Sequence, residues 1–182
     1  QVEYHIDLTP YRYMLAMTKM DLYNAHICAD FEPDLGREHL FQTAFHVGKD
    51  VEAFTVVGGQ TLFSPSISIY SLEERMHAGH VIRKTLITKQ YSYTQYLRER
   101  DDKSILLYIL RADGSIEFFT PNIELQASAG DAIVALTSQA KTIERVKERL
   151  EEENGDTEIP YEKLEEMFTE DSSLSKRDIP GE

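Results

Sequence analysis

The chain has 182 residues and a formal net charge of −13, which argues against nonspecific binding to nucleic acid or to an anionic membrane surface, because both need a basic face. A single cysteine, Cys28, excludes an internal disulfide and fits a reducing compartment. No apolar run approaches the roughly 20 residues of a membrane helix, so the chain is not expected to cross a bilayer.

The first part of the chain predicts a strand–helix–strand unit of the α/β kind. Residues 14–18 are a short apolar run that fits either a buried strand or the start of a helix. Apolar side chains at helical spacing predict a helix over 20–32, which Pro33 and Gly36 are expected to end. Residues 38–44 then predict a second short strand.

The middle of the chain predicts a loop, a helix and a strand. Residues 46–60 contain several glycines and are expected to form a loop. The sequence Ser-Leu-Glu-Glu that begins at Ser71 is a capping box, and it predicts a helix over 71–78 that Gly79 ends. Residues 81–87 predict a strand.

A helix and three strands are expected next. Residues 92–100 predict a short helix with a serine cap, and 104–110 predict a strongly apolar strand. The Asp-Gly pair in 112–115 predicts a hairpin turn, followed by a return strand over 116–120. Residues 132–136 predict a final strand. The apolar strand 104–110 fits either the core of a dimer or a core strand within one chain.

The last quarter of the chain is strongly acidic. Residues 141–182 hold 14 acidic and 7 basic side chains, which is typical of a solvated helical tail. Helices are expected over 143–153 and 160–168, and residues 169–182 are expected to be disordered.

No catalytic motif is present in the sequence. The glycines form no phosphate-binding cluster, and neither a GxSxG nor an HExxH pattern occurs. His77 and His80 have a spacing that two ligands of one metal ion can have, but two exposed polar residues beside Gly79 are the simpler interpretation. Cys28 is expected to be a buried packing thiol. We therefore expect no catalytic residues, no metal site and no enzyme.

The segment from Val81 to Leu136 resembles the C-terminal, ligand-sensing lobe of the RCK domain (TrkA-C). The similarity rests on the order strand 81–87, helix 93–100, the turn Arg-Ala-Asp-Gly at 111–114, Pro121, and the sequence Gly-Asp followed by an apolar strand over 130–136. In physical terms, the glycine permits a tight turn and the aspartate bonds backbone amides in it.

The preceding segment resembles the late strand and helix of a TrkA-N nucleotide-binding fold. Met-Leu-Ala-Met-Thr over 14–18, followed by Asp21 and Asn24, carries this similarity. Together with the intervening segment 62–79, residues 10–140 are similar to the cytoplasmic C-terminal region of bacterial monovalent cation:proton antiporters of the NhaP type.

The resemblance implies a fold of the α/β (α+β) class in three parts. Residues 1–62 would be a truncated Rossmann-like TrkA-N half whose Gly-rich strand is absent. Residues 63–140 would be a TrkA-C-like lobe with a mixed sheet and helices. Residues 141–182 would be the acidic helical tail.

The resemblance also implies a function. The chain would be the cytoplasmic regulatory domain of a sodium or potassium/proton antiporter, a multi-pass protein of the plasma (inner) membrane whose transmembrane domain precedes Gln1. It would form a homodimer and sense a small-molecule ligand, for which an adenine nucleotide is the candidate. A stand-alone ligand-binding or subunit-interaction protein of the potassium-uptake regulator type is the alternative, and an α/β enzyme is the third.

We choose candidate ligand-binding residues by their positions in the expected strands and turns. Arginines near strand ends suit phosphate groups, although surface ion pairs are the simpler interpretation of both. Two front residues lie where the TrkA-N crevice would be, and the aspartate there also suits a helix N-terminus. The full set is His80, Arg83, Arg111, Asp113, Asn122, Thr18 and Asp21.

Overall fold

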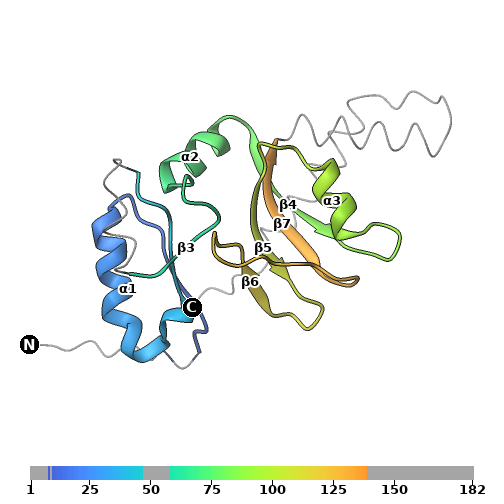
Figure 1. Cartoon of the computed structure of the whole chain (residues 1–182). Coiled ribbons are helices and arrows are strands. Elements are labelled where there is room, and N and C mark those ends of the chain that lie inside the picture. Colours follow the sequence, from blue (N-terminus) through green and yellow to red (C-terminus); the bar gives the residue numbers. More distant parts are fainter. Residues whose placement is uncertain (1–7, 9, 47–57, 139–182) are drawn as a thin grey trace, which may run out of the picture.

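The computed structural model describes residues 8, 10–46 and 58–138, and these residues form two β-sheets with three α-helices (Figure 1). The α/β (α+β) class expected from the sequence is confirmed. The predicted helices over 143–153 and 160–168 and the predicted disorder over 169–182 lie outside the described residues, as does most of the expected loop 46–60.

A parallel sheet forms the first part of the molecule. Its elements are β1 (Met14–Ala16), α1 (Asp21–Leu35), the 3₁₀ turn Arg37–His39, β2 (Leu40–Gln42) and β3 (Gln60–Thr61). The sheet order is β1-β2-β3, and β2 pairs in parallel with both neighbours. Of the two interpretations of residues 14–18, the strand is therefore correct. α1 crosses from β1 to β2 and packs Cys28 between them, fully buried against Ala16 and Leu40.

α1 ends later than the sequence predicted. Pro33 lies inside the helix, although a proline was expected to end it. The position is tolerated because a proline this close to the end removes only one hydrogen bond from the last turn. Gly36, with a φ of +80°, ends the helix as predicted, and its N–H donates to Glu32 O over 3.0 Å.

An antiparallel sheet forms the second part. Its elements are α2 (Ile69–His77), β4 (His80–Leu86), α3 (Tyr93–Glu99), β5 (Ile105–Leu110), β6 (Ile116–Phe118) and β7 (Ala132–Ser138). The sheet order is β4-β7-β5-β6, and every bonded pair is antiparallel, so the expected mixed sheet is wrong. The reason is topological. α3 connects two strands of the same direction, β4 and β5, but β7 lies between them and runs opposite to both.

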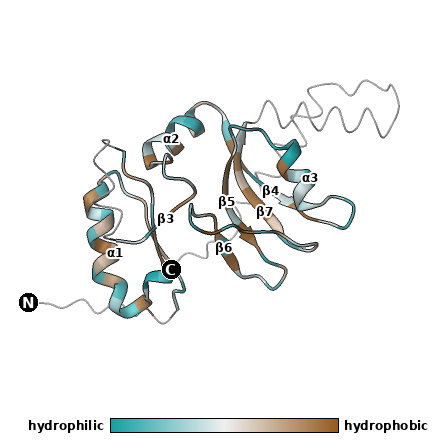
Figure 2. Ribbon diagram, in the orientation of Figure 1, coloured by the Kyte–Doolittle hydropathy of each residue, from teal (hydrophilic) through white to brown (hydrophobic). Residues whose placement is uncertain are grey.

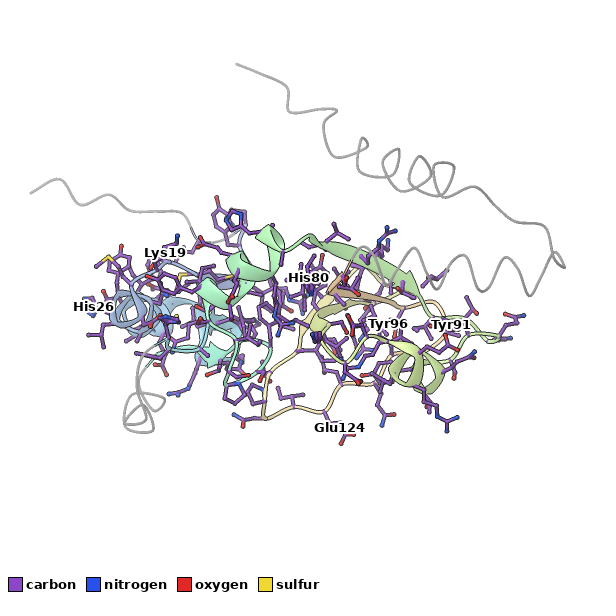
Figure 3. All side chains as sticks on the ribbon, turned by 90° about the horizontal axis from the view of Figure 1, so that it is seen from above. Lys19, His26, His80, Tyr91, Tyr96 and Glu124 are labelled. Carbon is purple, nitrogen blue, oxygen red and sulfur yellow. The ribbon has the colours of Figure 1, made fainter. Side chains whose placement is uncertain are left out.

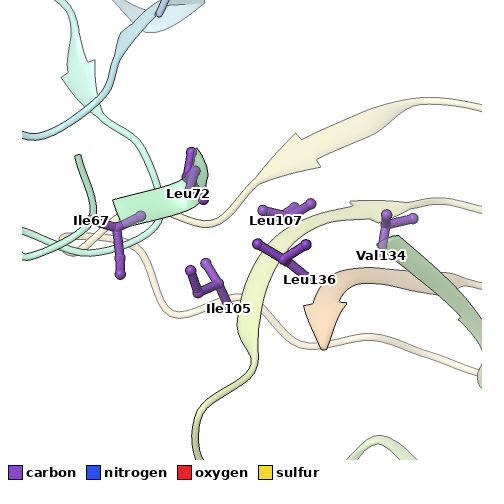
Figure 4. Close-up of a cluster of buried hydrophobic side chains, with 6 residues drawn as sticks. All are labelled: Ile67, Leu72, Ile105, Leu107, Val134 and Leu136. Atoms are coloured by element: carbon purple, nitrogen blue, oxygen red, sulfur yellow. The ribbon is translucent and has the colours of Figure 1, made fainter. Parts of the chain in front are cut away.

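A β-bulge in β5 gives the antiparallel sheet two unequal faces. Leu106 pairs with Ala135 and Tyr108 with Val134, so Leu107 is an extra residue. Leu107 and Val134 then join a cluster on one face with Ile67 and Leu72 (Figure 4). The other face carries a second cluster, which packs beneath α3 and the segment after β6: Ile87, Tyr96, Ile109, Phe119 and Ile133.

Because both faces are covered, the apolar character of β5 is explained within one chain. Figure 2 shows hydrophobic residues gathered along this strand in the middle of the molecule. Ile105, Leu107 and Ile109 are buried, and the residues between them are half-buried. A dimer is therefore not needed to account for this pattern.

The N-cap of α2 lies three residues before the serine at which the predicted helix begins. Ser68 is the N-cap, and its hydroxyl accepts a hydrogen bond from the Ser71 N–H. Ser71 therefore does not open the helix, and its own hydroxyl donates to Ser68 O over 2.8 Å. Ser68 and Ser71 are both residues that can cap a helix. With the cap at Ser68, Leu72 is buried in the cluster that contains Ile67.

An aromatic seam joins the two sheets. Phe118 of β6 contacts Phe41 of β2, with ring centroids 5.0 Å apart, and Tyr13, with centroids 5.6 Å apart and planes at 90°. The Tyr13 hydroxyl donates to Ile116 O over 3.0 Å. Beside this seam, Phe63 N–H donates to Phe119 O over 2.6 Å. The edge strand β6 is thus covered by the parallel part rather than by solvent.

Candidate functional site

The carboxyl edge of the parallel sheet holds a group of polar side chains. The chain leaves β1 through Thr18 and Lys19 and enters α1 at Asp21. It leaves β2 toward His46, and the start of α2 faces the same edge. In open α/β sheets, ligands bind in the crevice at this edge. The group is the candidate functional site, which we call the carboxyl-edge site: Thr18, Lys19, Asp21, Asn24, His46, Ser68, Tyr70 and Glu73.

Thr18 shapes the turn between β1 and α1. Its backbone N–H and its hydroxyl both donate to Asn24 Oδ1, over 3.0 and 2.6 Å. Asn24 Nδ2 returns a hydrogen bond to Thr18 O over 2.9 Å, and the Asn24 side chain is buried. These mutual bonds occupy Thr18, so its role in this structure is to hold the start of α1 in place.

Asp21 keeps one acceptor available. Its Oδ2 atom accepts a hydrogen bond from the His46 N–H over 2.7 Å. Its Oδ1 atom is buried and has no partner among the described residues. A carboxylate oxygen accepts hydrogen bonds only, and leaving it unpaired when buried is costly. A ligand here would therefore present a hydroxyl or amino donor to Asp21, while a phosphate group would be repelled by its charge.

A stack of side chains connects this edge to α2. The His46 ring lies on the Tyr70 ring with centroids 4.4 Å apart, and His46 Nδ1 is 3.3 Å from the Ser68 hydroxyl. Lys19 Nζ lies 5.6 Å from the Tyr70 ring centroid and 2.7 Å from Glu73 Oε2. Hydrogen bonding to Glu73 raises the pKa of Lys19 above its ordinary value, so this cation is held in its charged form.

The other predicted ligand residues lie elsewhere. Figure 3 labels Lys19 in the parallel part and His80 near the middle of the molecule. His80 and Arg83 belong to β4, opposite Ser138 and Ala135 of β7. Both ring nitrogens of His80 are buried and have no partner within the described part of the chain. Asn122 lines a cavity of about 700 Å³ beside β3, together with Arg37, Glu38 and Gln60.

Arg111 is an ion-pair partner in this structure. Its guanidinium bonds Asp131, over 2.8 Å, and Glu117, and it also donates to Gln126 O over 2.7 Å. The carboxylate of Asp131 also accepts from the N–H groups of Ser128 and Ala112, over 2.8 and 3.0 Å. Burial opposes the charge of Asp131, but these bonds outweigh it and keep the pKa of Asp131 below its ordinary value.

Asp113 completes its own turn. It accepts hydrogen bonds from the Ser115 hydroxyl and N–H, over 2.6 and 2.8 Å, and these bonds lower the pKa of Asp113. The Asp-Gly hairpin is confirmed, with Gly114 at a φ of +85°. Arg111 and Asp131 therefore form a clamp that ties the hairpin to the Gly-Asp turn before β7, whereas Asp113 stabilises the hairpin turn itself.

The structure does not gather the predicted residues into one site. Thr18 and Asp21 lie together at the carboxyl edge, whereas the candidates of the second part are spread over β4, the hairpin and the cavity beside β3. Sequence reasoning missed His46, Ser68 and Tyr70, because they come from separate segments with no motif. The usable signal was that His46 follows the second strand of the predicted strand–helix–strand unit.

Three further structural findings concern metal ligands, membrane-spanning helices and the free cysteine. In the described ranges, no group of three or more His, Cys, Asp or Glu side chains is placed to hold a metal ion. No helix among these residues has the length and apolar character that crossing a membrane requires. Cys28 is a buried free thiol, as predicted, and its burial raises its pKa.

Comparisons with known proteins identify no relative. No protein family, no curated protein and no solved structure matches this chain.

Proposed function

We propose that the chain is the regulatory domain of a monovalent cation:proton antiporter, and that it senses a small ligand and biases transport. The sequence resemblance to the NhaP-type cytoplasmic region supports the class. In this proposal the domain lies on the cytoplasmic side of the membrane, pairs with a second copy and acts on its own upstream transporter domain.

The path through α2 is the observation that carries the proposal. At its N-terminal end, Ser68 and Tyr70 contact His46, which in turn bonds Asp21. One turn later, Leu72 is buried in the cluster that lines the antiparallel sheet. The helix then leads directly into β4. A ligand that changes Asp21 or His46 therefore acts on a helix that is packed against the second sheet.

The mechanism follows from differential binding. A ligand shifts a two-state protein only if its affinity for the two states differs. In the conformation described above, Asp21 Oδ1 has no partner among the described residues. A donor from the ligand would satisfy this oxygen and favour the arrangement of His46 and α2 that allows the bond. The free energy that couples ligand binding to transport is then the difference between the ligand's binding free energies for the two states. An adenine nucleotide fits only through its hydroxyl or amino donors, because Asp21 repels phosphate.

The test uses the reading frame that contains the chain. Cation-dependent proton exchange in inverted membrane vesicles is measured for the natural protein and for Asp21→Asn, with and without added adenine nucleotides. We expect exchange in both proteins, and a nucleotide response that Asp21→Asn reduces at least tenfold in apparent affinity. A frame without membrane helices, or one without cation-dependent exchange, contradicts the proposal.

The alternative is a stand-alone binding protein of the potassium-uptake regulator type. In this alternative the chain uses the same two sheets and the same ligand site, but no transporter domain belongs to the same polypeptide. The upstream reading frame distinguishes the two. Light scattering tests the pairing common to both, because a measured mass near the 20.9 kDa of one chain contradicts a homodimer.

A further inference from the structure

A cavity at the junction of the two parts has a composition that the proposed function does not use. It has a volume of about 300 Å³ and lies among the segment before α2, the end of α2, the loop between α3 and β5, and the segment after β6. Its apolar lining includes Phe63, Ile105 and Phe119. A volume near 300 Å³ is at the lower end of small-ligand pockets. We call it the junction cavity.

Three basic side chains line the junction cavity, although the chain as a whole is strongly acidic. They are Arg75 of α2, Arg100 at the end of α3 and Lys103 in the loop. One acidic residue, Asp102, lines it as well, so the lining has an excess of two positive charges. Among the described residues, no carboxylate forms an ion pair with any of the three cations. Such a concentration of unneutralised cations around a concave site attracts anions.

The hydrogen bonds of the two arginines leave most of their donors available. Arg75 Nη1 donates to Lys103 O, and Arg100 Nη1 donates to the carbonyl and hydroxyl oxygens of Ser104, over 3.3 and 3.4 Å. A guanidinium has five N–H donors in a planar fork, so each group is held in place through one nitrogen while its other donors stay unused by the described residues.

A buried hydroxyl provides a second, independent observation. Thr120 lines the junction cavity, its side chain is only 7% exposed, and its Oγ1 atom has no hydrogen-bond partner in the described part of the molecule. A buried hydroxyl without a partner costs roughly 1–3 kcal/mol. An acceptor oxygen of a bound anion would satisfy it.

We propose that the junction cavity binds the phosphate group of a small phosphorylated metabolite. A tetrahedral oxyanion has enough acceptor oxygens for two guanidinium forks, an ammonium and a hydroxyl at once, which a carboxylate has not. The cavity volume exceeds that of the phosphate group, and its apolar lining suits the organic part of a phosphomonoester. The site lies apart from Asp21, and the proposal does not rest on a role in ion transport.

The test is calorimetric titration of the whole chain with inorganic phosphate and with glycerol 3-phosphate, at constant ionic strength set with chloride. We expect saturable binding of both, with a dissociation constant on the order of 1 mM for phosphate and tighter binding of the monoester. Arg100→Gln and Lys103→Gln should each weaken binding about tenfold, and Thr120→Val about threefold. Phosphate should also raise the unfolding temperature of the natural chain.

Arg98→Gln is the matched control. Arg98 lies on α3 close to Arg100, is exposed and does not line the junction cavity, so this change removes the same charge without touching the site. An equal loss of affinity in Arg98→Gln and Arg100→Gln overturns the proposal, as does the lack of saturable binding of both ligands up to about 20 mM. If Arg100→Gln fails to fold, Lys103→Gln decides, because the Lys103 side chain bonds nothing among the described residues.

Discussion

The two sheets of this molecule differ in how much of their own stability they can provide. The parallel sheet has strands of three, three and two residues, and its core cluster contains three buried residues. The antiparallel sheet has two strands of seven residues and contributes to two larger clusters. A short parallel sheet with so small a core depends on neighbours for stability. It obtains them from the aromatic seam and from α2.

This difference in core size suits separate roles for the two sheets. The proposed sensing site lies in the part with the smaller core, where local opening costs less free energy. The antiparallel sheet provides a rigid partner against which such a change can act. The predictions that follow test this contrast, beginning with the largest effect.

The first prediction concerns the two cores. Ile133 of β7 is fully buried in the cluster beneath α3, and Ile133→Ala should lower the free energy of unfolding by about 4 kcal/mol, because it leaves a cavity in that cluster. Leu40→Ala in the parallel part should instead speed amide exchange in residues 14–42 first. Urea unfolding measures the loss of stability in Ile133→Ala, and hydrogen exchange followed by mass spectrometry measures the exchange rates in Leu40→Ala. If Leu40→Ala speeds exchange equally in β5 and β7, the two parts unfold as one unit and the contrast is wrong.

The second prediction compares two glycines. A Cβ atom on Gly58 would lie 2.7 Å from Gln42 Oε1 and 2.9 Å from Ala25 Cα, and its φ of +112° is strained for any other residue. Gly58→Ala should therefore cost about 3 kcal/mol. Gly114→Ala has a positive φ but open space, and should cost only about 1 kcal/mol. Equal urea midpoints for the two variants would contradict the close packing of Gly58 against Ala25 of α1 and Gln42 of β2.

The third prediction concerns pH and the clamp. The pKa of Asp131 is lowered in the folded state. Its ionised form therefore stabilises the fold above the unfolded-state pKa of about 4, and this stabilisation is lost as the pH falls through the lower folded-state pKa. Asp131→Asn should cost about 2 kcal/mol at pH 7, and most of that cost should disappear as the pH falls through the lowered pKa of Asp131. Asp113→Asn, on the same hairpin but exposed, is the control and should change the urea midpoint far less.

The smallest effect is expected from the two serine caps. Ser68→Ala and Ser92→Ala each remove one helix N-cap, and each should cost about 1 kcal/mol. Only Ser68 also contacts His46, so only Ser68→Ala should move the NMR signals of the His46 ring. A shift of the His46 signals in both variants, or in neither, would show that α2 is not coupled to the carboxyl edge in the way described.

Local sequence patterns were sufficient for much of the fold. β4, β5, β7, α3 and the Asp-Gly hairpin were predicted close to their observed bounds, since each depends on its own residues. β3 was not, because two residues form a strand only through pairing with β2. The position of β7 between β4 and β5 was missed for the same reason: pairing between distant strands leaves no local pattern.

The site was predictable only in part. Thr18 and Asp21 were found because a strand followed by a helix places such residues at the carboxyl edge. The hydrogen-bond partner of Asp21, His46, follows β2, and no spacing rule links it to Asp21. The ion pair that the sequence offered as the alternative for Arg111 is confirmed, but its partner Asp131 was not visible, because the two residues come together only when β5 and β7 pair.

The place of β7 in the sheet also determines how the chain must fold. β4 and β5 emerge from the ribosome well before β7, and neither bonds the other. Both therefore keep an unpaired edge until β7 has emerged from the ribosome, and only then can the sheet close through contacts of long sequence separation. Such topologies fold slowly and expose aggregation-prone edges on the way. A ribosome-bound chain that stops before β7 should therefore bind chaperones, and release from them should coincide with the arrival of that strand.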